Sequence, residues 1–177
     1  VSDLVLQVKL NGEWQKVESL VSNLGPSMQR GYDKAVSQFS RNLLAIVKKS
    51  LTLGIPPMGG GVTWQPLSPA TIERWGQHPI YNLTGLYSRS VGLYRYKSRV
   101  LIGLPIGTRR SSQKKLTLNQ LAMMLEFGSS DGRIPPRPVW APSLKAAGGK
   151  NKLKQLILTE IRKELQKYGV RPNQVKW

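Results

Sequence analysis

The sequence contains no cysteine and a single histidine, His78. Without cysteine the chain has no disulfide framework, no thiolate zinc site and no cysteine nucleophile. One imidazole also excludes a metal site built from several histidines and a proton relay between two of them. The chemistry that remains depends on hydroxyl, carboxylate, amide, cationic and apolar side chains.

Acidic residues are scarce. The 177 residues include 27 Lys or Arg and 9 Asp or Glu, which gives a formal net charge of +18. The excess is uneven, because residues 74–159 hold 15 basic and 2 acidic residues and so carry +13. A surface so one-sided repels itself unless a polyanion or an acidic partner faces it. Nucleic acid, an acidic protein surface and a basic surface with no dedicated ligand all stay open.

Long apolar runs are also missing. No uninterrupted stretch approaches the roughly 18 apolar residues that a membrane span requires. The first ten residues alternate and include Asp3, whereas a signal peptide begins with basic charge and continues as a solid apolar block. We expect a soluble protein made in the cytoplasm, with no membrane contact. An apolar content of 40% over 177 residues suffices for a single domain with a core of its own.

The N-terminal part of the chain predicts a hairpin and then a long helix. Residues 3–10 place Leu or Val at every second position, which is typical of a half-buried strand. Asn11-Gly12 is the preferred pair for a tight turn, so residues 13–17 are predicted to return as a second strand within an N-terminal hairpin unit, residues 1–24. The break at residues 25–27 predicts the start of a helix that keeps its apolar spacing as far as Leu53.

The middle and the end of the chain alternate short elements and loops. Residues 54–63 are rich in glycine but lack the Gly-Lys-Ser/Thr of a phosphate-binding loop, so we interpret them as a linker. The apolar run at residues 100–102 predicts a central strand covered on both faces. Helices are predicted over 69–75, 85–91, 118–127 and 146–169, strands over 93–96 and 99–104, a basic loop over 105–116, and N-caps at Ser68, Thr84 and Thr117. The fold class is α+β: an antiparallel sheet packed by a long N-terminal helix, short helices and a C-terminal helix.

No catalytic constellation is evident. His78 precedes a proline in a loop, and a lone histidine is most often structural. The nine acids show neither the spacing of a carboxylate pair nor that of a divalent-cation site. Aromatic residues interleaved with Arg and Lys can stack on single-stranded bases, but packing is the commoner use of such side chains. We expect no enzyme activity, cofactor or metal, and interpret the chain as an interaction or structural protein.

Five short motifs follow one another within residues 28–145. They are WQPLSPAT at 64–71, LTGL at 83–86 with Ser90, VLIG at 100–103, LA at 121–122 with EFG at 126–128, and IPPRP at 134–138. Their order and spacing resemble the phage virion morphogenesis family, the tail-completion or neck proteins of long-tailed, Mu-like bacteriophages. The chain departs from the family pattern at Leu121, where an aromatic residue is usual, and at Val139, where phenylalanine is usual.

The resemblance implies an α+β subunit of the virion that assembles into a ring, typically of six copies, at the head-proximal end of the tail. It implies no catalysis. A homo-oligomeric ring, neighbouring neck, connector or tail-tube proteins, and non-specific contact with genomic DNA are the expected partnerships. A basic nucleic-acid-binding protein that acts as a monomer or small oligomer is the alternative. The family-like core spans residues 25–145, and a tail spans residues 170–177.

Two groups of residues are the expected interaction sites. The first is a strut at residues 134–138, whose prolines hold Arg137 for a bidentate bond to main-chain carbonyls or to a carboxylate, with Glu126 as a candidate. The interface residues are expected to be Glu126, Pro135, Pro136, Arg137, Pro138, Trp140 and Trp177. The second is a basic surface that faces the ring lumen or a partner, formed by Arg109, Arg110, Lys114 and Lys115. The hairpin and the tail are expected to dock on neighbouring subunits.

Overall fold

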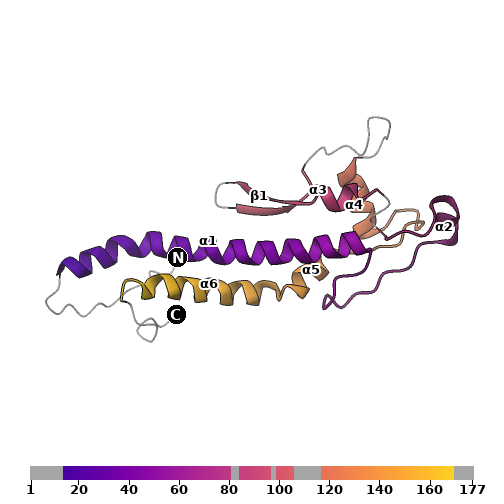
Figure 1. Ribbon diagram of the computed structural model, residues 1–177. Helices are drawn as coiled ribbons and strands as arrows, with labels where there is room; N and C mark the ends of the chain where they lie inside the picture. Colours follow the sequence, from indigo (N-terminus) through magenta and orange to yellow (C-terminus); the bar gives the residue numbers. More distant parts are fainter. Residues whose placement is uncertain (1–13, 81–83, 97–98, 106–116, 170–177) are drawn as a thin grey trace. The chain divides into compact units, whose positions relative to one another are not determined.

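The computed structural model of the chain describes residues 14–80, 84–96, 99–105 and 117–169 (Figure 1). These residues form six helices and one antiparallel pair of strands, which confirms the α+β class with a long N-terminal helix. The chain divides into two compact units: unit 1 comprises residues 1–35 and 156–177, and unit 2 comprises residues 36–155. Helices α1 (Trp14–Leu53) and α6 (Gly149–Gln166) contribute residues to both units.

Helix α1 begins at Trp14, and this corrects two predictions. Residues 14–17 are helical and do not form the return strand of a hairpin, and the helix does not start at residues 25–27. Pro26 lies inside α1, where it lacks the N–H that would bond to a carbonyl one turn earlier. Apolar residues recur at helical spacing on both sides of this proline, so the continuous pattern outweighs one missing bond. Residues 3–13, with the predicted first strand and turn, lie outside the described residues.

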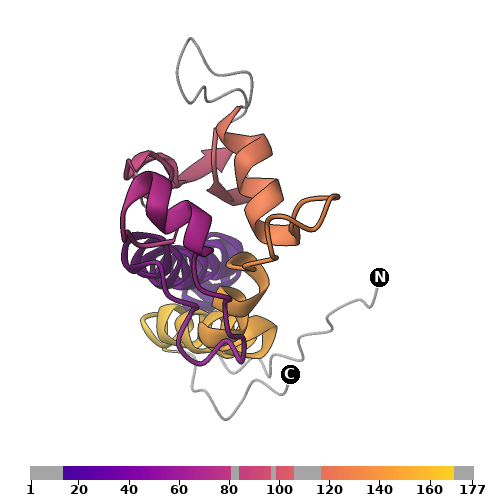
Figure 2. The same ribbon diagram turned by 90° about the vertical axis from the view of Figure 1, so that its right-hand side faces the viewer.

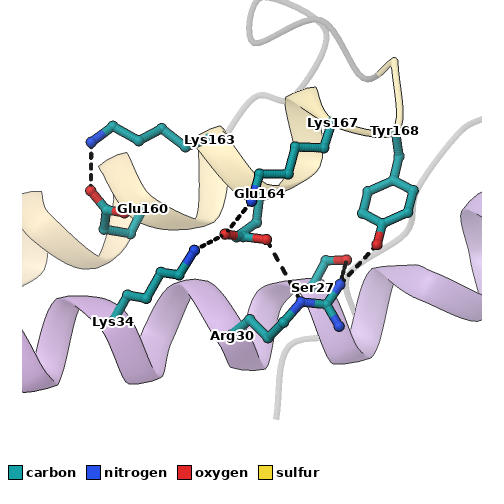
Figure 3. Close-up of polar contacts among 8 residues, drawn as sticks. All are labelled: Ser27, Arg30, Lys34, Glu160, Lys163, Glu164, Lys167 and Tyr168. Atoms are coloured by element: carbon teal, nitrogen blue, oxygen red, sulfur yellow. Dashed lines mark hydrogen bonds and ion pairs between the residues drawn. The ribbon is translucent and has the colours of Figure 1, made fainter.

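Unit 1 is built on a close contact between its segments of α1 and α6 (Figure 3). Gly31 permits this approach, because a Cβ built on it would lie 2.7 Å from the Cα of Ile161. Ser27 and Ala35 of α1 are also fully buried, as is most of Leu165 of α6. The small residues of α1 therefore leave room for the backbone and apolar side chains of α6.

The core of unit 2 is a cluster of buried apolar side chains from segments far apart in the sequence. Val47 and Leu51 of α1 lie one helical turn apart and are fully buried. They share this cluster with residues of α3 (Leu86–Ser90), of α4 (Leu118–Phe127) and of the segments that follow each of these helices. Those residues are Tyr87, Val91, Leu118, Ala122 and Val139.

Most helix ends in unit 2 follow the predicted local signals. Helix α2 (Pro69–Trp75) begins after Ser68, whose hydroxyl accepts a main-chain N–H of the first turn. Thr117 caps α4 in a reciprocal capping box with the third helical residue. The cap of α3 is Gly85 and not Thr84, because the left-handed backbone at Gly85 delays the helix by one residue.

Strands β1 (Gly92–Tyr96) and β2 (Arg99–Gly103) form the predicted antiparallel hairpin. The prediction that β2 is a central strand covered on both faces is wrong. Leu101 is 55% exposed and lies opposite Tyr94, which is exposed as well. The sheet has two strands in the part of the chain that the structure describes, so the face that carries Leu101 and Tyr94 stays open.

The sequence pattern does not predict helix α5 (Trp140–Ala146). Its seven residues are too few to display an apolar period, and Pro142 stands within it. The C-terminal helix α6 is confirmed but starts at Gly149 and not at residue 146. The positive φ of +91° at Gly148 separates the two helices.

Candidate interaction site

Arg137 is buried, and its guanidinium binds the main chain of a distant loop in unit 2. Its Nε donates to the carbonyl of Gln65 and its Nη2 donates to the carbonyl of Pro66, both at 3.1 Å. A guanidinium can serve two adjacent carbonyls because its N–H groups form a fixed planar fork. The prediction that Arg137 binds main-chain carbonyls is therefore confirmed, and the bonds lie within one chain.

The strut, residues 134–138, lies in the orange loop that joins α4 to α5 (Figure 2). Further bonds attach it to the rest of unit 2. The indole N–H of Trp64 donates to the carbonyl of Pro138 at 3.1 Å, and the main-chain N–H of Arg137 donates to a carbonyl of α4 at 2.7 Å. Pro135 and Pro138 are partly buried, whereas Pro136 is exposed. The strut is thus bonded to α4 on one side and to the loop before α2 on the other.

Glu126 has a role that the sequence did not predict. Its carboxylate accepts the main-chain N–H of Val139 at 2.7 Å and that of Trp140 at 3.2 Å. These N–H groups lie at the start of α5, where Val139 supplies no side-chain cap, so Glu126 takes the place of a capping residue. Burial raises the pKa of the Tyr87 hydroxyl, and the charge of Glu126 adds to this effect. In place of the candidate pairing between them, Glu126 accepts two main-chain N–H groups and Arg137 donates to two main-chain carbonyls.

An apolar groove lies next to these contacts in unit 2 and encloses about 450 Å³. Met123 and Phe127 of α4 line it and are 62% and 75% exposed. Leu104, Ala122, Trp140 and Ala141 complete its apolar wall, and Asn119 and Glu126 contribute the polar atoms. The Oδ1 atom of Asn119 is buried and has no hydrogen-bond partner among the described residues. The sequence pattern predicted the bounds of α4 but not this outer stripe, whose signal is apolar residues at i and i+4 opposite the core face.

A second cavity in unit 2, of about 170 Å³, is lined by Arg137, by leucines of α3 and α4 and by residues of the segments before α2 and α3. His78 belongs to its wall, with Nδ1 2.9 Å from the carbonyl of Pro79 and Nε2 buried without a partner in the described chain. The described residues that line the cavity include no Asp or Glu that could orient His78. The cavity has room for a small apolar group.

Five predicted site residues lie outside the described residues. They are the basic residues Arg109, Arg110, Lys114 and Lys115 and the tail residue Trp177. Their roles remain predictions. Within the described ranges, no three His, Asp or Glu side chains lie close enough together to hold a metal ion, and no helix is long and apolar enough to cross a membrane.

Unit 1 contains a buried carboxylate that three cations share (Figure 3). The side chain of Glu164 is 4% exposed and lies 2.5 Å from Lys34 Nζ, 2.8 Å from Lys167 Nζ and 3.6 Å from Arg30 Nε. Arg30 also donates to the hydroxyls of Ser27 and Tyr168, at 2.8 and 2.9 Å. The bonds from Lys167 and Lys34 hold the pKa of the Glu164 carboxyl at about 2, well below its ordinary value of 4.5.

A Glu164→Gln protein is expected to unfold more easily than the wild type at neutral pH, by about 1–2 kcal/mol, since a neutral amide leaves the cations unpaired and solvent screens part of the loss. The pKa is lower in the folded state, so the carboxylate stabilises fully above its ordinary pKa and loses this effect as the pH falls toward about 2. The difference between wild type and variant should therefore shrink over that range. Urea unfolding followed by circular dichroism measures it.

The matched control is Glu73→Gln, which changes an exposed carboxylate on α2. We expect this substitution to leave the free energy of unfolding within about 0.5 kcal/mol of the wild-type value. A Glu164→Gln effect that does not change between neutral and acidic pH would contradict a role for the ionised carboxylate.

Comparison with known proteins gives no relative, since no family model, curated protein or solved structure matches the chain. The resemblance described above therefore rests on the order and spacing of the motifs in residues 64–138.

Proposed function

We propose that this chain is a structural subunit of the bacteriophage neck, a tail-completion or head–tail joining protein that forms a ring in the virion, with six copies favoured. The proposal starts from the five motifs and their order. The structure of unit 2 supports it, because residues of different motifs are joined by hydrogen bonds. The polar side chains of the motifs bind main-chain groups in these contacts.

The observation that carries the proposal is the bonding between the first motif and the last. Arg137 and Pro138 of the last motif bind the carbonyls of Gln65 and Pro66 and the indole of Trp64, all from the first. Glu126 of the fourth motif binds the main chain just after the last. Side chains used in these bonds fix the loops of the subunit in place, and we expect them not to act on a substrate. Such a pattern suits a subunit whose task is to present surfaces to its neighbours.

The charge of the chain gives the ring a role in the passage or packaging of DNA. Residues 74–159 carry +13, and a ring through which DNA passes places many such surfaces around one polyanion. Acidic faces on the adjoining connector or tail-tube rings would balance the same charge. Contact with DNA would be non-specific, since phosphates bind Lys and Arg without regard to sequence.

Electron microscopy tests the proposal. Immunogold labelling of phage particles should place the protein at the neck, and the purified protein should form closed rings in negative stain. Light scattering at low and high salt separates the alternative, a monomeric nucleic-acid-binding protein. That alternative predicts a monomer that binds duplex DNA with a steep dependence on salt. Label spread over the cell, with no ring and no labelled particle, would overturn the proposal.

Replacement of Arg109, Arg110, Lys114 and Lys115 by Gln is expected to leave the thermal unfolding curve unchanged and to lower the yield of joined particles severalfold. Four bases without an acid are costly to bury, so these residues are expected to face a partner. The control replaces four exposed lysines elsewhere in unit 2, Lys145, Lys150, Lys152 and Lys154, by Gln and so removes the same charge. A complementation assay that counts infectious particles compares the two. Equal losses would show that total charge matters and the position of the loop does not.

A further inference from the structure

The groove of unit 2 has the features of a docking site. Phe127 and Met123 are the two most exposed apolar side chains of α4, and both line the same hollow of about 450 Å³. Large apolar side chains that remain in water mark interaction surfaces when they cluster around a hollow. The hollow is large enough for one large aromatic side chain together with an aliphatic one.

The polar atoms of the groove restrict what can fill it. Asn119, Met123 and Phe127 follow one another at intervals of four residues, about 6 Å apart along one stripe of α4. The Oδ1 atom of Asn119 is a buried acceptor without a donor in the described chain. An acceptor left in this state is unfavourable, and an occupant that brings an N–H group would supply the missing hydrogen bond. The best occupant is therefore apolar, large and equipped with a single donor.

Tryptophan combines these properties, because its indole is large and apolar and its Nε1–H is a donor that accepts nothing. Among the five tryptophans, Trp64 already donates to Pro138, Trp140 is part of the groove wall, and Trp14 and Trp75 lie within helices α1 and α2. Trp177 belongs to a segment, residues 170–177, that lies outside the described residues. Val175 precedes it by two positions and so shares its face in an extended chain. Pro172 opposes helix formation in this segment.

We infer that residues 170–177 of a second copy of this chain dock in the groove, with the Trp177 indole packed on Met123 and Phe127 and its N–H donated to Asn119. The charges agree, since the segment carries Arg171 and Lys176 and the groove contributes the carboxylate of Glu126. A tail that enters the groove of the next copy is a head-to-tail contact, which closes into a ring when the rotation per copy permits. The inference thus supplies the contact between subunits that the proposed ring requires.

Two full-length variants test the inference together. Trp177→Ala removes the indole and keeps the groove, and Phe127→Ser opens the groove and keeps the tail. Each variant alone is expected to sediment as a monomer at concentrations at which the wild type is assembled. Mixed in equal amounts, they are expected to form a dimer and nothing larger, because one tail and one groove remain functional in the pair. The control Met58→Ser, which alters a side chain 68% exposed outside the groove, should assemble like the wild type.

A labelled peptide of residues 168–177 locates the contact and its hydrogen bond. Its affinity for the full-length Trp177→Ala protein, measured by fluorescence anisotropy, should fall at least about tenfold when Phe127→Ser is added. A peptide with Trp177→Phe keeps the ring and loses the donor. On a protein with Asn119 it should bind about fivefold more weakly than the Trp177 peptide. On an Asn119→Leu protein, which lacks the acceptor, the two peptides should bind with similar affinity.

Each outcome decides the inference. A mixture that stays monomeric overturns the inference, and so does a peptide whose binding does not depend on Phe127. Either result is expected if another segment of the same chain fills the groove. Peptide binding together with a monomeric wild type at every concentration also overturns it, because the tail then docks within its own chain. The inference rests on the proposed function for its ring but is separable from it. If the mixture forms a dimer but no label is found at the phage neck, the contact is retained and the neck role is rejected. If both variants still form rings like the wild type, the ring is retained and the contact is rejected.

Discussion

A Gly31→Ala protein is expected to lose about 2 kcal/mol or more of stability. The added Cβ would lie 2.7 Å from Cα and 2.8 Å from N of Ile161, and 3.0 Å from the carbonyl carbon of Glu160. All three atoms belong to the backbone, which cannot rotate away as a side chain can. The two helices must therefore separate, and the contacts made by Ser27 and Ala35 loosen with them.

Gly25→Ala is the matched control, because Gly25 lies in the same helix and a Cβ there meets no atom within 4 Å outside its chain neighbours. Alanine is a better helix former than glycine, but a Cβ directly before Pro26 is disfavoured in helical backbone, so the two effects oppose each other and the free energy of unfolding should change by less than about 1 kcal/mol. The same chemical change should thus be costly at Gly31 and nearly neutral six residues earlier. Urea unfolding monitored by circular dichroism at 222 nm, roughly the helix minimum, measures both. A Gly31→Ala protein as stable as Gly25→Ala would contradict the close contact of α1 and α6 in unit 1.

Replacement of Arg137 by Met is expected to destabilise the protein by about 2–4 kcal/mol. Methionine fills much of the volume but leaves the carbonyls of Gln65 and Pro66 without the donors that they have at 3.1 Å. Arg137→Lys should recover only part of the loss, because one ammonium group cannot reproduce the planar fork. The order of stability is therefore wild type, then Lys, then Met.

Arg133→Met controls for the loss of a positive charge in the same loop. The side chain of Arg133 is 86% exposed, and its ion pair with Asp131 is exposed as well, so this change should alter stability by less than about 0.5 kcal/mol. Differential scanning calorimetry provides the melting temperature of all four proteins. An Arg137→Met protein that melts with Arg133→Met would show that the guanidinium does not hold the strut.

Local signals in the sequence predicted local structure well. Ser68 and Thr117 begin the helices that they were expected to cap, and strands β1 and β2 pair as expected. Each of these signals acts within three or four residues, where backbone geometry and one side chain decide the outcome. The environment of Arg137 was predicted only in part. The three prolines around it indicated a fixed side chain, but the sequence did not identify Gln65 and Pro66 as its partners.

Features that depend on distant segments could not be predicted in this way. The run at residues 100–102 indicated a covered strand, but whether a neighbour covers Leu101 is a property of the assembled unit and not of the run. Pro26 indicated a helix start, yet the penalty for a proline inside a helix is outweighed when flanking residues keep the apolar pattern. The groove on α4 was missed because exposed Met123 and Phe127 differ from core residues only in what packs against them.

The capping of α5 by Glu126 has a consequence for the order in which the chain folds. Seven residues are too few for a helix to persist by itself in water, and α5 has no capping side chain of its own. The N–H groups of Val139 and Trp140 at its start bind the carboxylate of Glu126, which lies on the last turn of α4, 13 and 14 residues earlier in the sequence. We therefore expect helix α5 to form after α4 is in place. In that order the groove wall that contains Trp140 is completed late in folding, and a partner can dock only after the core of its own unit has formed.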